Sequence, residues 1–334
     1  MDHGSATSSA PVTPAVSVII VTWRRPAHVD SCLQALARLR TPPLEVLVVD
    51  ASEDHATADV VARYAHVRRL PFPAGAGHMT SARNYGLLHA RGDVIAFLDD
   101  DANVRPAWLD NLLDAHEPAD VGAVAGRTCD PGEAGSTGPS GSVGLLLPDG
   151  RLTGNFDVDT GLVIDVDHGI GANMSFKRAV LARLGGFRDD FPGTALREDT
   201  DIFFRVRAAG WRAVFAPGAV ADHTGAPHVK GQRFDFRYVF WARHNHALLL
   251  GRNLGLGAPA TRRWIVGEMK NLGGAPTSNW LRRAFRLLAG ASALLLGVFR
   301  AGIKGGWSPT AAERKDAQGR QIRLQLLSQR PRRG

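Results

Sequence analysis

Runs of apolar residues alternate with helical repeats along the first hundred residues. Residues 16–22, 44–49 and 94–98 are short runs dominated by Val, Ile and Leu, the pattern of strands buried on both faces. Between them, apolar positions recur every three or four residues at 26–41, 56–65 and 81–89, and a short edge strand is predicted at 67–70. This alternation predicts an α/β fold: a mostly parallel sheet with helices on both faces and a ligand crevice at the carboxyl ends of the strands.

The second half of the chain is less regular. Residues 130–161 are rich in Gly, Pro, Ser and Asp, which predicts a long loop or a weak hairpin around 145–147. Beyond it we expect a regular segment at 162–166, helices at 177–184 and 198–209, and a last strand at 212–216. We therefore divide the chain into a disordered tail (1–15), an α/β domain (16–225), a basic helical extension (226–310) and a basic tail (311–334).

The composition limits the classes of partner. Of the 334 residues, 44% are hydrophobic, as in ordinary globular proteins, and the net charge is +8. A basic excess after residue 230 fits nucleic acid, anionic lipid or a phosphorylated substrate. We expect no nucleic-acid partner, because the sequence has no zinc finger, RNA-recognition signature or basic heptad region. Cys32 and Cys129 lack metal-ligand spacing and residues 1–15 lack a signal-peptide pattern, so we expect a cytoplasmic protein with reduced thiols.

The strongest chemical signal is the run Asp99, Asp100 and Asp101, directly after the apolar run 94–98. Ligands of open α/β sheets bind beyond the carboxyl ends of the strands, and adjacent unpaired carboxylates repel one another. A divalent cation such as Mg²⁺ or Mn²⁺ relieves that repulsion, often together with substrate phosphates. The alternative is a solvated acidic turn, but the motifs around the run favour the metal site.

Four motifs stand in order along the chain. They are Asp50 after a predicted strand, Ser-Ala-Arg-Asn-Tyr-Gly at 81–86, the aspartates at 99–101, and Arg-Glu-Asp-Thr-Asp at 197–201. Together they resemble the family 2 glycosyltransferases of the GT-A fold, over about residues 16–225. The resemblance implies a Rossmann-like GT-A domain, a nucleoside-diphosphate sugar as donor, with a UDP-sugar as the first expectation, and inverting transfer to an acceptor hydroxyl.

The resemblance implies a donor side built from five residues. Asp50 matches the position that hydrogen-bonds the base, and Asp99 the position near the ribose. Arg83 lies in the first turn of a predicted helix, where a guanidinium and backbone N–H groups both face phosphate. The alternative for Arg83 is a surface salt bridge. Thr22 and Asp100 complete the donor side.

The resemblance also assigns the metal and the base. Asp101 would hold Mn²⁺ or Mg²⁺, and His223, after a predicted strand and turn, would be a further ligand in preference to His228. Glu198 and Asp199 begin a predicted helix, where acidic residues are also ordinary partners of the helix dipole. In the resembled family such a pair supplies the general base. We assign Asp199 as the base and Glu198 as the residue that orients it or the acceptor, and the exchanged roles stay open.

On the acceptor side, Gly171 and Asn173 lie in the segment 169–176, which resembles the family's wall beneath the donor sugar. Glycine permits close backbone approach, and Asn173 could hydrogen-bond sugar or diphosphate. The alternative is an ordinary tight turn. One departure concerns the turn after Asp50, because residues 51–54 read Ala-Ser-Glu-Asp without the glycine usual in the family. Base selectivity therefore stays open.

The C-terminal extension carries a second signal. Its charge-free stretch 287–299 is too short to span a bilayer, but arginines and aromatic residues flank it, as in helices that lie in membrane interfaces. The alternative is a helix that packs on the domain. An anionic membrane surface is therefore a candidate partner, with the protein peripheral at the inner face of the membrane. The acceptor would be a sugar, a lipid-linked molecule or a small molecule.

Two other functions stay open at this point. A nucleotidyltransferase shares the sheet and the acidic metal site, but would have a glycine-rich loop after the first strand, where Trp-Arg-Arg-Pro stands at 23–26. A non-catalytic module that binds nucleotide sugars would not need the full set of carboxylates. The sequence does not name the sugar, the nucleotide or the acceptor.

Overall fold

The computed structural model describes residues 14–131, 142–193, 195–225, 236–272, 280–304 and 309–328. Nearly all of the predicted N-terminal tail lies outside these ranges, as do His228 and residues 329–334.

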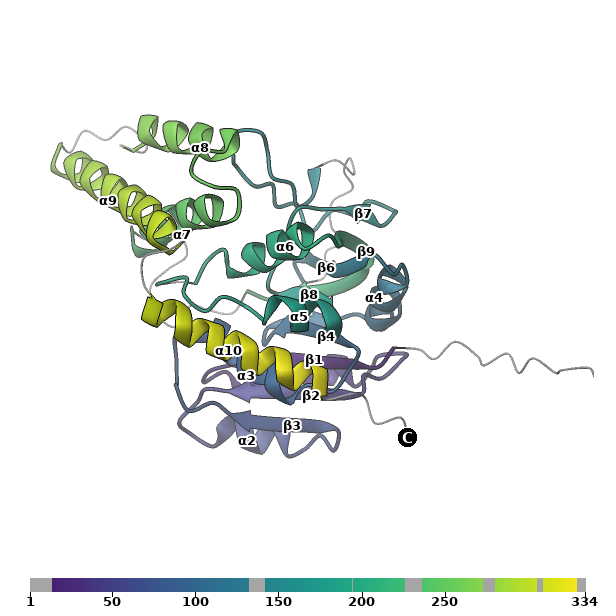
Figure 1. Cartoon of the computed structure of the whole chain (residues 1–334). Helices are drawn as coiled ribbons and strands as arrows, with labels where there is room; N and C mark the ends of the chain where they lie inside the picture. Colours follow the sequence, from purple (N-terminus) through teal and green to yellow (C-terminus); the bar gives the residue numbers. More distant parts are fainter. Residues whose placement is uncertain are drawn as a thin grey trace, which may run out of the picture.

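The domain is built on one mixed sheet (Figure 1). Its strands are β1 (Val16–Thr22), β2 (Glu45–Asp50), β3 (Val67–Pro71), β4 (Val94–Asp99), β5 (Ala102–Val104), β6 (Val121–Cys129), β7 (Ile164–Asp165), β8 (Asn173–Lys177) and β9 (Arg212–His223). The order across the sheet is β3-β2-β1-β4-β8-β6-β9-β5. The first four strands pair in parallel, β8 lies antiparallel between β4 and β6, and both β5 and β7 pair antiparallel with β9.

Helices cover both faces of this sheet (Figure 1). On one face lie α3 (Met79–His89), α5 (Arg178–Leu184) and α6 (Glu198–Ala208), and on the other α1 (Pro26–Leu36), α2 (Ala56–Val61) and α4 (Trp108–His116). Neighbouring strand residues point to opposite faces, so Ile19 packs in the first core and Ile20 in the second. The predicted α/β fold with helices on both faces is confirmed.

The second half of the sheet differs from the prediction. The sequence pattern does not reveal β5, β6 or β8, because glycine or polar residues interrupt their apolar runs. β9 is also longer than expected, since it continues from residue 216 to His223. The longer strand brings His223 to the edge where the aspartate run lies.

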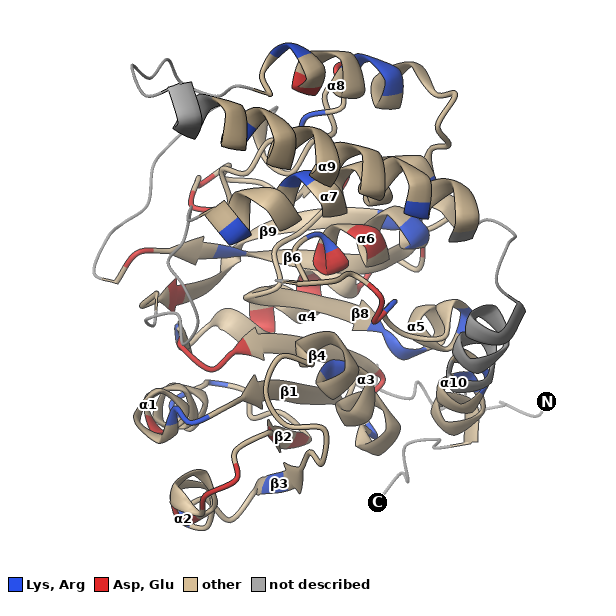
Figure 2. Ribbon diagram, turned by 90° about the vertical axis from the view of Figure 1, so that its left-hand side faces the viewer, with Lys and Arg blue, Asp and Glu red and all other residues tan. Residues whose placement is uncertain are grey.

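The described residues of 236–272 and 280–304 form an extension with the helices α7 (Phe236–Asn253), α8 (Pro259–Lys270) and α9 (Trp280–Lys304). α7 and α9 lie side by side (Figure 1) and share a core that includes Leu248, Leu294 and Ala301. Figure 2 shows basic positions on all three helices, above the acidic first turn of α6. Part of α9 thus packs on the protein, as the alternative for this segment expected.

One segment of α9 corrects the expectation of a stretch too short for a bilayer. Among the described residues, Ala284–Ile303 is long and apolar enough to cross a membrane by length and composition, with a mean hydropathy of 1.5. From the sequence only residues 287–299 were counted, because Arg286 and Arg300 end the charge-free stretch. Only 28% of this segment is buried in the protein.

The final described segment returns to the α/β domain. Residues 309–328, most of the predicted basic tail, form helix α10 (Pro309–Ser328), which packs on α3 and α5. Ile322 and Leu326 are buried in the first core, and Arg323 donates hydrogen bonds to carbonyl oxygens at the end of α5. The described part of the segment expected as a basic tail is thus a helix whose apolar residues pack on the α/β domain.

Candidate active site

The carboxyl ends of three parallel strands bring the predicted donor residues to one edge of the sheet. β1 ends at Thr22, which pairs in register with Asp50 of β2, and Val21 pairs with Asp99 of β4. Parallel neighbours end on the same side of the sheet, and ligands of such sheets bind there. Residues far apart in the sequence are therefore neighbours.

Two neighbouring side chains, Thr22 and Arg25, contact the carboxylate of Asp100. Thr22 Oγ1 donates a hydrogen bond to Asp100 Oδ2 at 2.7 Å, and Arg25 Nη1 lies 3.1 Å from Oδ1. Burial raises the pKa of Asp100 to about 6, against the opposing effects of Thr22 and Arg25. Since both carboxylate oxygens are engaged, these contacts fix the turn that presents Asp99 and Asp101.

Asp50 lies beside a pocket of about 300 Å³ at the end of β2. Arg69 Nε donates to its Oδ2 at 2.8 Å, and the backbone N–H of Ser52 donates to Oδ1 at 2.9 Å. These bonds hold a buried carboxylate in one orientation. The pocket is lined by the turn after β2 and the loop after β3, namely Asp50, Ala51, Ser52, Glu53, Pro71, Phe72, Pro73 and Gly75.

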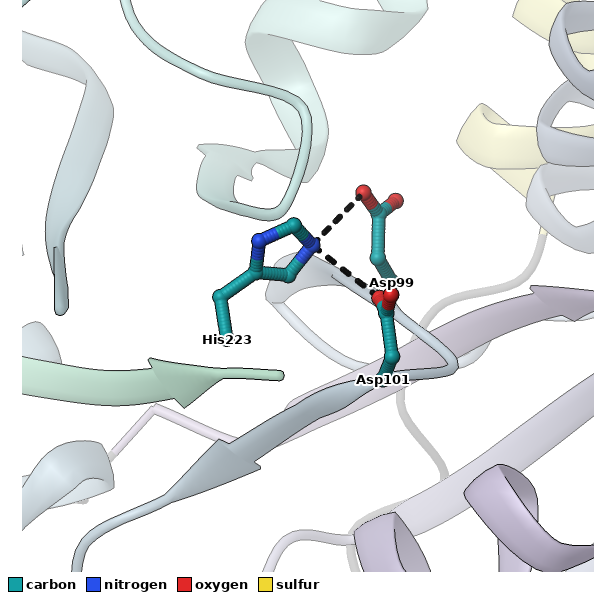
Figure 3. Close-up of side chains that lie close together, drawn as sticks. All are labelled: Asp99, Asp101 and His223. Atoms are coloured by element: carbon teal, nitrogen blue, oxygen red, sulfur yellow. Dashed lines mark ion pairs between the residues drawn. The ribbon is translucent and has the colours of Figure 1, made fainter. Parts of the chain in front are cut away.

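Asp99, Asp101 and His223 form a candidate metal centre (Figure 3). His223 Nε2 lies 3.0 Å from Asp101 Oδ1 and 3.9 Å from Asp99 Oδ2, and one ligand atom from each residue falls within 4.8 Å of the others. The pairing of β5 with β9 creates this contact by placing Ala102 opposite His223. Two carboxylates with one imidazole fit a divalent cation such as Mn²⁺ or Mg²⁺.

Arg83 connects this centre to the start of α6. Its guanidinium forms an ion pair with Glu198, lies 3.2 Å from Asp99 Oδ1, and donates to the backbone oxygen of Gly171 at 3.3 Å. Arg83 is buried, so it is not the surface arginine of the alternative reading. Burial raises the pKa of Glu198 to about 8, although Arg83 acts to lower it.

Asp199 is oriented by backbone groups. The N–H of Gly171 donates to its Oδ2 at 3.0 Å, and the N–H of Thr200 donates to its Oδ1 at 2.7 Å. A Cβ at Gly171 would lie 2.9 Å from Arg83 Nη2, so a larger residue here would displace the Arg83 guanidinium. Asp199 is only partly buried, whereas Glu198 is buried.

Asn173 is a correction. The residue is fully buried at the start of β8, where its Oδ1 accepts from Trp108 Nε1 at 2.9 Å. Its Nδ2 donates at 2.9 Å to the backbone oxygens of both Arg127 and Ala219. The side chain has no group left for a ligand, so the expected contact with acceptor or diphosphate is wrong, and Asn173 is a core residue.

Comparison with known proteins identifies this arrangement. The family model described as glycosyl transferase family 2 matches residues 17–185, which is more than half of the chain. The chain belongs to glycosyl transferase family 2. The matched segment contains Asp50, Arg83, the aspartate run and Gly171, and it ends before Glu198.

The curated relatives of this family 2 protein are only partly alike. It is 37% identical over 119 residues to validoxylamine A glucosyltransferase of Streptomyces hygroscopicus subsp. limoneus, covering 34% of this chain and 26% of that protein. It is 28% identical over 214 residues to the succinoglycan biosynthesis protein ExoM of Rhizobium meliloti, covering 61% and 65%. The chain thus spans less than two thirds of either relative.

Solved structures share the fold. The mannosyltransferase PcManGT from Pyrobaculum calidifontis, in complex with GDP-Man and Mn²⁺, aligns with a TM-score of 0.50 at 20% identity over 96% of this chain and 86% of that one. Residues 1–349 of S. aureus TarS align with a TM-score of 0.56 at 14% identity over 96% and 93%. At these identities the likeness concerns the fold alone.

The family 2 site contains residues that the sequence motifs do not reveal. Arg25 and Arg69 each contact a predicted donor residue, and Trp108 anchors Asn173. Arg25 directly precedes the helix after β1, a position that could have been noticed. Nothing in the local pattern distinguishes Arg69 or Trp108, because their partners come from other strands.

Proposed function

We propose that the chain transfers a sugar from a nucleoside-diphosphate donor to an acceptor hydroxyl, with inversion at the anomeric carbon. The observation that carries this proposal is the position of two acidic sites on either side of one buried arginine. Asp99, Asp101 and His223 lie at the strand ends, and Glu198 with Asp199 lies at the start of α6, with Arg83 in contact with both groups.

Asp101, His223 and Asp99 would hold Mn²⁺ or Mg²⁺, which when bound neutralises charge on a departing diphosphate. The pocket beside Asp50 would take the base, and a UDP-sugar is the first donor to test. Asp199 would accept the proton of the acceptor hydroxyl. The hydroxyl oxygen then bonds to the anomeric carbon as the bond from that carbon to the diphosphate oxygen breaks, and the electron pair leaves with the diphosphate.

Gly171 and Arg83 support this step without taking part in bond making. The Gly171 N–H holds one Asp199 oxygen, which leaves the other for Thr200 and the acceptor. Arg83 keeps Glu198 out of solvent. We propose Glu198 as the residue that positions this turn, and Asp199 as the base.

The test is a screen of UDP-, GDP- and TDP-sugars with Mn²⁺, read by thermal shift and by release of the nucleoside diphosphate. A ligand at 100 times its Kd raises stability by about 2.7 kcal/mol, which is readily measured. Transfer from an α-linked donor should give a β-linked product by NMR. Retention of the anomeric configuration, or nucleotide rather than sugar transfer, would contradict the proposal.

We also propose that the protein works in the cytoplasm at an anionic membrane surface. Cys32 and Cys129 are both buried free thiols, which suits a reducing compartment. On α9, Leu288, Leu295 and Phe299 are 70%, 68% and 63% exposed and recur on one face of the helix, opposite the face that packs on α7. Arg286 and Arg300 flank this stripe, as in helices that lie in a lipid interface. An acceptor held at the membrane would suit this position.

A further inference from the structure

The residue before the acidic pair has an unusual backbone. Arg197 has a φ of +81° and a ψ of 3°, in the left-handed region that residues with a Cβ rarely adopt. Ala195, two residues earlier, also has a positive φ of +56°. Strained backbone of this kind is concentrated at active sites and ligand clamps. The turn that presents Asp199 is therefore held in a conformation that a regular helix start would not need.

Among the described residues, the Arg197 guanidinium has no hydrogen-bond or ion-pair partner. Its Nε atom is buried without a hydrogen bond, and its side chain makes no hydrogen bond or ion pair with any residue that the structure describes. Other arginines with little exposure are engaged: Arg83, beside the acidic pair, contacts two carboxylates, and the partly buried Arg205 of α6 donates to two backbone carbonyls. An unpaired group of this kind in a folded protein calls for an explanation.

Few charged groups near Arg197 balance the positive charge of its guanidinium. Burial lowers the pKa of Arg197, and the charges of Asp199 and of Tyr238 on α7 oppose this effect. His168 and His246 are both buried, and the positive charge of Arg197 contributes to lowering the pKa of each. Burial lowers the pKa of His168, and lowers that of His246 to about 3, so both rings are neutral near pH 7.

Hydrogen bonds to backbone carbonyl oxygens hold the rings of His168 and His246 in place. His168 Nε2 lies 2.9 Å from the carbonyl oxygen of Thr153, and His246 Nε2 lies 2.8 Å from that of Gly150. The His246 ring stacks against Trp264 of α8, with 4.6 Å between ring centroids. Arg197 is therefore a guanidinium between the α/β domain and the helical extension, next to the base and beside neutral side chains.

We propose that Arg197 binds an anionic group, a phosphate or a carboxylate, on the acceptor molecule. The inference rests on the proposed function, because it places this group beside the hydroxyl that Asp199 deprotonates. A guanidinium offers several N–H donors in one plane, which match the oxygens of phosphate or carboxylate. When Asp199 takes up the proton it loses its charge, and the acceptor's anion then balances Arg197.

The competing role for Arg197 is to keep Asp199 ionised. The two roles differ in what a substitution changes. Loss of an anion site raises KM for charged acceptors and leaves neutral acceptors unaffected. Loss of support for Asp199 lowers kcat for every acceptor alike.

The experiment measures binding of glucose 6-phosphate, glucuronate and glucose by calorimetry at constant ionic strength. The protein is first saturated with Mn²⁺ and the nucleoside diphosphate found in the donor screen, so that the donor site is filled. The variants are Arg197→Gln and Arg197→Lys, with Arg212→Gln as the control, since Arg212 is an exposed arginine paired with Asp165. Failure of the nucleotide to bind at all would count against the proposed function and is seen before any sugar is added.

Wild type should bind at least one charged sugar about tenfold or more tightly than glucose. Arg197→Gln should abolish this preference, Arg197→Lys should retain part of it, and Arg212→Gln should retain all of it. Preference for glucose 6-phosphate assigns a phosphate, and preference for glucuronate assigns a carboxylate. No preference in wild type, or the same preference in Arg197→Gln, overturns the proposal.

Discussion

The guanidinium of Arg83 lies against the carboxylate of Glu198, although the two residues are 115 positions apart in the chain. Both side chains are buried, and the contact joins α3 to the first residue of α6. The same guanidinium lies 3.2 Å from Asp99 Oδ1, so Arg83 links Glu198 to a carboxylate of the candidate metal centre.

Glu198→Gln should change how stability depends on pH. The carboxyl has an ordinary pKa of 4.5 and a pKa of about 8 in the folded protein. Between these values the folded protein retains a proton that the unfolded chain has released. The free energy of unfolding therefore falls as pH rises from about 5 to 8, by at most about 1.4 kcal/mol per pH unit. Glutamine removes this contribution.

Urea unfolding at pH 5, 6, 7 and 8 checks this prediction. The stability of Glu198→Gln relative to wild type should increase with pH over this range. Glu117→Gln, on an exposed helix end, is the matched control and should track wild type. A difference between Glu198→Gln and wild type that stays constant with pH would show that Glu198 is not protonated by burial.

Asp199→Asn should leave donor affinity nearly unchanged and reduce turnover by about 10²–10⁴-fold, the usual range for loss of a general base. Asparagine keeps the shape of the side chain but cannot accept the proton. Turnover and donor binding are measured separately, by release of nucleoside diphosphate and by calorimetry. A collapse of donor affinity would assign Asp199 to the donor site, and retained turnover would transfer the base role to Glu198.

Asp101→Ala should weaken Mn²⁺ binding in the presence of nucleotide by at least about tenfold, because even residues that only support a metal ligand have effects of this size. Asp101 is buried and lies 3.0 Å from His223, nearer than the 3.9 Å of Asp99. Calorimetry with and without Mn²⁺ provides the measurement, and exposed Asp114→Ala is the control. Equal donor affinity with and without Mn²⁺ in wild type would rule out the metal centre.

Asn173→Ala should destabilise the protein by about 3 kcal/mol or more, because it leaves Trp108 Nε1 and two backbone carbonyls buried without partners. Trp108→Phe, which removes only the first of these bonds, should cost less. Denaturant unfolding measures both. Unchanged stability with weakened sugar binding would return Asn173 to the acceptor side.

Two exposed leucines on α9 allow a test of the membrane proposal. Replacing both Leu288 and Leu295 by glutamine should reduce flotation with anionic liposomes and leave the unfolding midpoint unchanged, since both are largely exposed. The matched control replaces Leu324 and Leu327 of α10, which are 68% and 60% exposed, on a different face of the molecule. Binding by wild type should fall at high salt. Equal flotation of all three proteins, or none under any condition, would remove the proposal.

The proximity of Thr22, Asp50 and Asp99 could be predicted from the sequence because each stands at the end of an apolar run. Asp50 and Asp99 end strands, and parallel strands that end together bring such residues to one edge. His223 was predicted as a ligand although the end of β9 was placed at residue 216. That prediction depended on the position of His223 after a strand and not on the residue at which the strand ends.

Contacts between distant segments could not be predicted in the same way. Asn173 stands in a glycine-rich segment that reads as a surface turn, yet it is inserted as the first residue of a strand between β4 and β6. Arg83 has the position expected of a phosphate ligand, but its partner is a carboxylate of α6. The positive φ of Arg197 could not be predicted, because nothing about an arginine in a sequence indicates a left-handed backbone conformation.

Helix α10 covers α3 and α5, and α3 carries Arg83. Ile322 and Leu326 belong to an apolar core whose other residues come earlier in the chain, from Ile19 onward. The ribosome makes a chain from its amino end, so the sheet and α3 emerge well before the helix that shields them. During synthesis this face stays open to chaperones until residue 326 has left the ribosome, and messages that stop before α10 should yield chains that cellular proteases remove.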